Sequence, residues 1–182
     1  MTAIRFGAVE RLGRRHTIER FECGRDQLDG WLRAYARQGQ GRDTARTFVV
    51  CAPEESDVLG YYTLVASQIE RDEATSLVQR GTSRHFPIPV CLIARLAVDR
   101  RAQGVGLGRS LLLDALQRTE YAARSVAMRA VLVHALDGKA ASFYERFGFK
   151  PASTDPLMLM VPLDAVRRTL SQRSDTALGW AR

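Results

Sequence analysis

The sequence predicts a mixed α/β fold, in which a sheet is flanked by helices. Stretches with helical spacing of apolar residues alternate with short runs of β-branched and aromatic residues. One of these runs, residues 90–98, is apolar on both faces apart from Arg95, which is typical of a central strand. The chain has 182 residues, of which 46% are hydrophobic and 26% charged, and this composition excludes wholesale disorder. We expect a single domain over residues 1–163, followed by a C-terminal helix and tail over residues 164–182.

The first element is expected to be one amphipathic helix over residues 24–38. Its apolar residues recur at the spacing that places them on one helix face: Leu28, Trp31, Leu32 and Tyr35. Asp26 is a suitable N-cap, and the glycines at positions 39 and 41 are expected to end the helix.

A hairpin and a polar segment follow. Residues 47–51 and 58–66 are rich in β-branched and aromatic residues and flank a turn at 53–57, so they predict two paired strands. Residues 68–86 are polar, with a short helical stretch near 71–79 and then a loop of Gly, Thr, Ser and Arg residues.

The C-terminal half alternates between strands and helices. The expected elements are a strand at 90–98, a helix at 107–123, a strand at 130–135, a helix after Asp137, a strand at 157–161 and a short helix beyond 164. Asp137 is the expected N-cap of its helix. Gly148 followed by Phe149 predicts a Schellman cap at the helix end.

Charge and cysteine content limit the function classes. The net charge is +7, and the basic residues are 25 Arg and 2 Lys. Arginine suits phosphate contact, but genome-wide GC bias favours it too, so charge alone leaves a nucleic-acid partner open. The three cysteines are far apart, so we expect neither a disulfide framework nor a metal site. No apolar run reaches about 20 residues and no signal peptide is evident, so we expect a cytoplasmic protein without a membrane partner.

The glycine-rich segment after residue 98 is the most informative about chemistry. A buried strand ends there, glycines follow and a helix begins, which together form a site for phosphate. The segment lacks the lysine of a Walker A loop, and its glycine spacing differs from the dinucleotide pattern G-x-G-x-x-G. Its pattern is instead Arg101-x-x-Gly104-x-Gly106.

This pattern resembles the pyrophosphate loop of the GNAT acetyltransferase superfamily, which binds acetyl-CoA. Residues 140–149, AASFYERFGF, resemble the segment that closes the GNAT core. The resemblance implies the GNAT acyl-CoA N-acyltransferase fold, with Tyr144 as the general acid and no metal. It implies these acetyl-CoA contacts: Leu96, Ala97, Val98, Gln103, Gly104, Val105, Gly106, Gly108 and Arg109. Many family members have Asn just after the preceding strand, where this chain has Ala135-Leu136-Asp137, so no amide contact is assigned there.

Further segments resemble the acetyltransferase toxins of bacterial type II toxin–antitoxin pairs. The similar segments, within residues 16–163, are 21–24, 28–32, 47–49, 60–64, 89–90, 95–99 and 133–135. The resemblance implies acetylation of the amino group of aminoacyl-tRNA, arrest of translation and a ribbon-helix-helix antitoxin as partner. Arg80 and Arg84, which have no acidic partner nearby in the sequence, are the expected tRNA contacts. Further candidates are Arg33, Arg37, Arg42 and Arg46. The sequence leaves open whether the chain forms a homodimer.

The chemistry leaves three alternatives open. Acyl transfer to an amine needs a neutral amine, a polarised carbonyl and a stabilised leaving thiolate. No carboxylate is a convincing base, and an α-amine with a pKa of ~7.7–8.0 needs no strong base. Besides the tRNA enzyme, an acetyltransferase for a protein N-terminus or small amine and a non-enzymatic binding module remain. Arg95 and His134 each remain open between a structural role and a role in the site.

Overall fold

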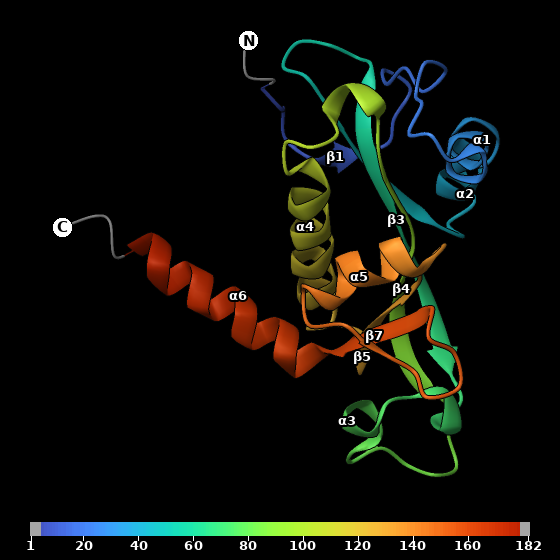
Figure 1. The fold of residues 1–182 in the computed structure, drawn as a ribbon, viewed down its shortest axis with the longest axis vertical. Helices are drawn as coiled ribbons and strands as arrows, with labels where there is room; N and C mark the ends of the chain where they lie inside the picture. The colour runs from blue at the N-terminus through green and yellow to red at the C-terminus, as the bar shows by residue number, and fades with distance from the viewer. Residues whose placement is uncertain (1–4, 179–182) are drawn as a thin grey trace. The chain divides into compact units, whose positions relative to one another are not determined.

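The computed structural model describes the backbone of residues 5–178 and the side chains of residues 5–172 (Figure 1). Seven strands are hydrogen-bonded in the order β1-β2-β3-β4-β5-β7-β6, so the predicted α/β class is confirmed, with β4 in the centre as expected. The chain forms two compact units. One comprises the chain up to Val65 together with Ile93–Ala115, and the other comprises Ala66–Leu92 together with the chain from Leu116 onward. The expectation of a single domain over residues 1–163 stays a prediction.

The first unit is built on an antiparallel hairpin. Its elements, some of which continue beyond it, are β1 (Glu10–Arg11), α1 (Asp26–Ala34), α2 (Ala36–Gly41), β2 (Arg46–Cys51), β3 (Val58–Ile69), β4 (Ile88–Val98), the 3-10 helix η2 (Arg100–Ala102) and α4 (Leu107–Ala122). Strands β2 and β3 pair from Arg46 opposite Leu64 to Cys51 opposite Val58. The predicted hairpin is therefore confirmed, although β3 continues three residues beyond its expected end.

The prediction of one continuous helix over residues 24–38 is wrong. The chain forms two helices, because Tyr35 has a φ of −122° and interrupts the helical backbone. Asp26 is the first residue of α1 rather than its N-cap, and Gly39 and Gly41 lie within α2. The interruption turns Tyr35 out to 59% exposure and buries Ala36 completely, so the apolar face predicted by the spacing does not extend past Leu32.

The core of the first unit joins α1 to the hairpin. Leu28 and Leu32 of α1 pack in one cluster with Val49, Tyr61 and Ala97. Tyr61 is fully buried, and its hydroxyl donates to the carbonyl of Leu28 at 2.8 Å. This bond satisfies the buried phenol and fixes α1 against β3.

The second unit carries the remaining elements. They are the 3-10 helix η1 (Arg71–Glu73), α3 (Ser76–Gln79), β5 (Ala130–His134), α5 (Gly138–Glu145), β6 (Lys150–Pro151), β7 (Met158–Pro162) and α6 (Leu163–Leu178). Strands β5 and β7 pair antiparallel from Ala130 opposite Pro162 to His134 opposite Met158. The final helix is longer than the short helix expected, because no Gly or Pro interrupts residues 163–178. The end of the predicted tail, residues 179–182, lies outside the described residues.

Both predicted caps of α5 are confirmed. The Asp137 carboxylate accepts a backbone N–H of the first turn at 2.8 Å. At the other end Gly148 has a φ of +86°, its N–H donates to the carbonyl of Glu145 at 3.0 Å, and the N–H of Phe149 donates to that of Tyr144 at 3.4 Å. These two bonds are the Schellman pattern. The rings of Tyr144 and Phe149 lie 5.5 Å apart, so the cap also positions Tyr144.

Replacing Gly148 by Ala is expected to lower the free energy of unfolding by about 1–2 kcal/mol, because a Cβ is strained in the left-handed conformation. Gly138→Ala is the matched control at the first position of the same helix. Gly138 has no left-handed φ and no atom within 4 Å of an added Cβ, so this change should be neutral or stabilising by up to about 1 kcal/mol. Urea unfolding followed by circular dichroism measures both variants. An equal loss in both would contradict the role of the cap.

Candidate active site

The glycine loop between β4 and α4 presents free backbone N–H groups. Gly104 and Gly106 have φ values of +78° and +86°, and no atom lies within 4 Å of a Cβ added at either position. Within the described part of the chain, the N–H groups of residues 104–109 donate to no protein group. The first turn of α4 adds its positive dipole end to these groups. The loop therefore has the open space and the donors that a phosphate group requires.

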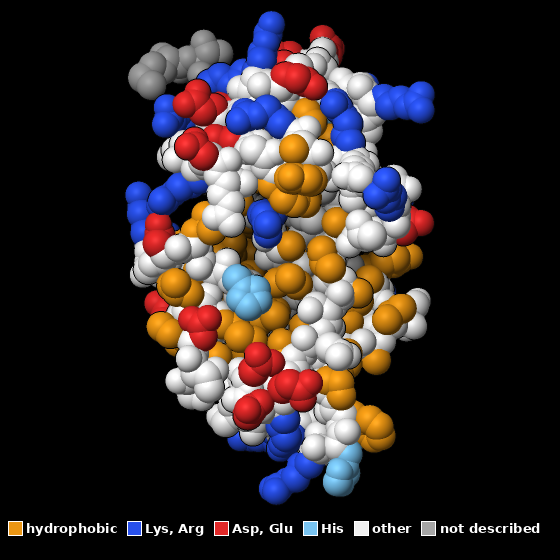
Figure 2. Space-filling model, turned by 90° about the vertical axis from the view of Figure 1, so that its right-hand side faces the viewer, with side chains coloured by type: hydrophobic (Ala, Val, Ile, Leu, Met, Phe, Trp, Pro, Cys, Tyr) orange, Lys and Arg blue, Asp and Glu red, His pale blue; other side chains and the backbone are white. Residues whose placement is uncertain are grey.

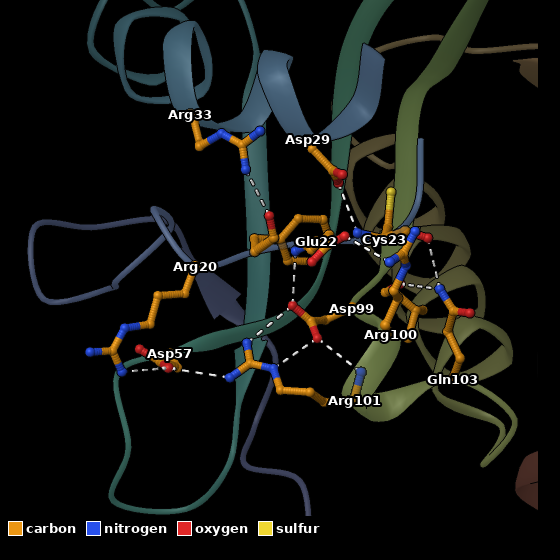
Figure 3. A network of polar contacts seen from close by, with 12 residues as sticks. Arg20, Glu22, Cys23, Asp29, Arg33, Asp57, Asp99, Arg100, Arg101 and Gln103 are labelled. Carbon is orange, nitrogen blue, oxygen red and sulfur yellow. Dashed lines mark hydrogen bonds and ion pairs between the residues drawn. The ribbon is translucent and has the colours of Figure 1, made fainter. Parts of the chain in front are cut away.

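A buried carboxylate fixes the start of this loop (Figure 3). Asp99, 1% exposed, follows the last residue of β4. Its Oδ1 accepts hydrogen bonds from the N–H of Arg101 at 2.9 Å and from Nε of Arg101 at 2.8 Å. Its Oδ2 accepts from Nη2 of Arg101 and from the N–H of Glu22, both at 3.0 Å. Arg101 also donates to Asp57 at 3.3 Å, so its guanidinium is engaged within the protein rather than free for a ligand.

Two further contacts join the segment at residues 22–23 to the glycine loop. The side-chain amide of Gln103 donates to the carbonyls of Cys23 and Val98, each at 2.9 Å (Figure 3). The N–H of Arg100 donates to the carbonyl of Glu22 at 2.8 Å. The chain on both sides of Asp99 is therefore held from outside, and the backbone of residues 104–106 starts from a fixed position.

The surroundings of Asp99 keep it ionised. Burial opposes the charged form, but hydrogen bonds from the Arg101 side chain and from the N–H groups of Glu22 and Arg101 outweigh it and lower the pKa of Asp99. The role of Asp99 was not predicted from the sequence. The available signal was a lone acid directly after a buried apolar strand, a position where an unpaired carboxylate would be costly.

The structure gathers the expected acetyl-CoA contacts in the first unit. The set consists of Leu96, Ala97 and Val98 at the end of β4 and Gln103, Gly104, Val105, Gly106, Gly108 and Arg109 in the loop and first turn of α4. The side-chain amide of Gln103 is already used by two carbonyls. If Gln103 contacts the cofactor, it therefore does so through its backbone. The assignment of this set to acetyl-CoA stays a prediction.

Tyr144, the expected general acid, lies on α5 in the second unit. Its side chain is 8% exposed, and its ring packs between Phe143 at 5.1 Å and Phe149 at 5.5 Å. Burial raises the pKa of Tyr144 to about 12. Its hydroxyl has no hydrogen-bond partner among the described residues. Tyr144 therefore holds a proton at neutral pH that no protein group binds.

Arg80 and Arg84 lie in the exposed loop after α3, also in the second unit. The loop is anchored by Arg129, which donates to the carbonyls of Leu77, Val78 and Arg80 at 3.0–3.1 Å. Basic side chains protrude at the lower end of Figure 2, with acidic side chains directly above them. Arg84 lines a hollow together with acidic residues of the η1 segment, Glu70 and Asp72. Neither acid forms an ion pair with Arg84 among the described residues, so the expectation that Arg80 and Arg84 have no acidic partner stays a prediction.

The other predicted contacts divide into engaged and free side chains. Arg33, Arg37 and Arg46 donate to the carbonyls of Phe21, His16 and Gln40, so they stabilise the fold. Arg42 is exposed and has no partner in the part of the chain that the structure describes. His134 is exposed at the end of β5, and the choice between a structural role and a role in the site stays open for it.

Comparison with known proteins defines the class to which this fold and loop belong. The model of the acetyltransferase (GNAT) domain matches residues 44–151, which include the glycine loop and Tyr144. The chain therefore belongs to the GNAT acetyltransferase family, as its sequence resemblance implied.

Individual relatives and solved structures belong to a narrower group than the family as a whole. The chain is 38% identical over 162 residues to a tRNA-acetylating toxin of Mycobacterium tuberculosis, covering 89% of this chain and 95% of the relative. It resembles the structure of AtaT complexed with acetyl-methionyl-tRNAfMet, with a TM-score of 0.81, 28% identity and coverage of 90% and 98%. It also resembles a Tyr-to-Phe mutant of the AtaT toxin bound to the C-terminus of the antitoxin AtaR and acetyl-CoA, with a TM-score of 0.76, 28% identity and coverage of 90% and 97%.

The described residues contain neither a membrane-spanning helix nor a cluster of metal ligands. No helix there combines the length and hydrophobicity that crossing a bilayer requires. Within the same part of the chain, no three His, Cys, Asp or Glu side chains converge where they could bind a metal ion.

Replacing Asp99 by Asn is expected to lower the free energy of unfolding by about 1–3 kcal/mol at pH 7, because the amide turns an acceptor into a donor that faces Arg101 and the N–H of Glu22. The pKa of Asp99 is lowered on folding, so its contribution is present above an unfolded pKa of about 3.9 and is lost as pH falls through the folded value. Urea unfolding between pH 7 and pH 3 should therefore show the difference from wild type shrinking.

Asp43→Asn is the matched control for this change. It removes an ion pair with Arg46 in which the Asp43 side chain is 78% exposed, and it should cost less than about 1 kcal/mol at every pH. A wild-type advantage over Asp99→Asn that stays constant with pH would mean that the charge of Asp99 does not stabilise the loop.

Proposed function

We propose that the protein is an N-acetyltransferase that transfers the acetyl group of acetyl-CoA to the α-amino group of an aminoacyl-tRNA. We propose further that it acts as a translation-blocking toxin and that a ribbon-helix-helix antitoxin neutralises it. The observation that carries this proposal is the similarity to a tRNA-acetylating toxin over 89% of the chain. The complex of AtaT with AtaR supports the antitoxin as partner.

The glycine loop fits the phosphates of acetyl-CoA. The N–H groups of residues 104–109 have no protein acceptor, and the space beside Gly104 and Gly106 is open. Arg109 is exposed in the first turn of α4 and adds a cation to the same end of the helix. When bound, acetyl-CoA supplies the acetyl group as a thioester. Backbone N–H groups near Ala97 or Val98 polarise the acetyl carbonyl.

Tyr144 protonates the leaving sulfur. Its pKa of about 12 keeps Oη protonated at neutral pH, and no protein acceptor competes for that proton. The aromatic contacts with Phe143 and Phe149 hold the ring in place, so little side-chain entropy is lost when it acts.

An α-amino group is a suitable acceptor for this set of residues. With a pKa of ~7.7–8.0, a useful fraction of it is neutral without a protein base, whereas a lysine amine at ~10.4 would need one. The structure of AtaT with acetyl-methionyl-tRNAfMet supports an aminoacyl-tRNA as the carrier of that amine. We assign Arg80 and Arg84 to phosphate contacts with the RNA, because their exposed guanidinium groups have no hydrogen-bond or ion-pair partner among residues 5–172.

Gly106→Asp is expected to abolish acetyl-CoA binding while the protein stays folded, because a carboxylate would occupy the space for the phosphates and repel them. Gly81→Asp is the control, since Gly81 also has a left-handed φ, +76°, and open space around its Cβ position. Both variants carry the same backbone strain and charge, but only Gly106 lies in the loop. Calorimetry that finds equal acetyl-CoA affinity in the two variants would rule the loop out as the phosphate site.

Tyr144→Phe is expected to acetylate charged tRNA at least ~100-fold more slowly in single-turnover assays, because a general acid contributes ~10²–10⁴-fold. Acetyl-CoA affinity should stay within about twofold, since only a hydroxyl is removed. Tyr121→Phe, at a tyrosine that is 74% exposed on α4, should react at the wild-type rate. Expression of Tyr144→Phe should no longer arrest growth. A rate within a few-fold of wild type would mean that solvent or another group protonates the sulfur.

A further inference from the structure

Arg95 on β4 carries a buried donor with no acceptor. Among residues 5–172, its Nε is the one buried side-chain nitrogen or oxygen without a hydrogen-bond partner. Its Nη1 donates to the carbonyl of Ala94 at 2.6 Å, and its guanidinium lies 5.4 Å from the centre of the Trp31 ring. No carboxylate of the described residues pairs with it. A buried donor left in this state is costly unless a ligand supplies the missing acceptor.

The guanidinium is held on a fixed aromatic support. Trp31 stacks on Tyr61, with ring centres 6.1 Å apart and an angle of 11° between planes. Tyr61 is fully buried and bonded to the carbonyl of Leu28. The guanidinium of Arg95 is therefore preorganised, and neither its Nε nor its Nη2 has a hydrogen-bond partner among residues 5–172. The edge formed by these two nitrogens matches two oxygens of one phosphate or carboxylate.

The position of Arg95 along β4 indicates which anion it binds. The phosphates of acetyl-CoA belong at the glycine loop, which begins after the end of β4 at Val98. Arg95 precedes the proposed thioester contacts, Ala97 and Val98, on β4. Its Cα lies about 7 Å along the strand from that of Ala97, in the direction away from the glycine loop. An anion at Arg95 is therefore part of the acceptor and not of acetyl-CoA.

We propose that Arg95 is a specificity-determining residue, which binds the phosphodiester nearest the acceptor amine. This inference rests on the proposed function and narrows it, because a peptide N-terminus or a simple amine carries no such phosphate. In a 3′-aminoacyl nucleotide, about eight bonds separate the α-amine from the 5′-phosphorus, which allows a distance of roughly 7–10 Å. That distance agrees with the separation of Arg95 from the thioester contacts.

The stability of the free protein provides the first test. Arg95→Met replaces a half-buried cation, whose buried Nε has no acceptor, by an apolar side chain that also packs well against Trp31. Its melting temperature, measured without ligands, should equal or exceed that of wild type. A purely structural role for Arg95 predicts a lower melting temperature, which would overturn the inference. Arg124→Met is the matched surface control, because the Arg124 side chain is 65% exposed and pairs with Glu120.

The second test compares two minimal acceptors, a 3′-aminoacyl-adenosine with and without a 5′-phosphate. Wild type and Arg124→Met should show at least a tenfold higher kcat/KM with the phosphate, which is about the effect of one charge-assisted hydrogen bond. Arg95→Met should show a ratio within about twofold of one, and Arg95→Lys an intermediate ratio, because lysine keeps the charge but not the fork. Acetyl-CoA affinity, measured by calorimetry, should be equal in all four proteins.

The outcomes separate this inference from the proposed function. If wild type acetylates charged tRNA but shows no preference for the phosphate, or if Arg95→Met keeps the preference, the inference is wrong and the function stands. A loss of acetyl-CoA affinity in Arg95→Met would assign the missing anion to the cofactor and would also overturn the inference. If wild type acetylates neither charged tRNA nor the nucleotides, the proposed function fails and the inference fails with it.

Discussion

The buried carboxylate of Asp99 is the interaction on which the glycine loop depends. It accepts four hydrogen bonds, three from Arg101 and one from the N–H of Glu22, a residue that is 77 positions away in the sequence. The carboxylate thereby fixes the point at which β4 ends and the loop begins. Without it, the N–H groups of Glu22 and Arg101 would lose their acceptor and the Arg101 guanidinium would keep only its contact with Asp57.

This arrangement leaves ligand binding to the backbone. The long polar side chains at the start of the loop, Arg101 and Gln103, both point back into the protein and satisfy acceptors there. The free donors are the N–H groups that follow, which need Gly104 and Gly106 for their left-handed conformation. The spacing of the glycines therefore predicts the loop from the sequence. The anchoring role of Asp99 could not be predicted in this way.

The sequence predicted features that depend on neighbouring residues and missed those that depend on distant ones. The Schellman cap at Gly148 and the hairpin were predictable, because a glycine with a following hydrophobe and two β-rich runs around a turn act locally. The break at Tyr35 was missed, because burial of Ala36 against the core overrides the regular helical spacing. The acidic neighbours of Arg84 were missed as well, because they lie on a preceding segment that the fold brings to the same hollow.

The polar groups that the protein leaves unsatisfied are those to which a function can be assigned. Nearly every buried polar atom in a folded chain finds a partner, so each exception has to be explained. Among the described residues, the N–H groups of residues 104–109 and the hydroxyl of Tyr144 have no protein partner, and Nε of Arg95 is the buried exception. An anion, a leaving sulfur and an acceptor phosphate would satisfy them in turn. Each of these groups lacks a partner in the free protein. Contacts with the substrates would supply the partners, so the binding energy would be used at the reacting groups.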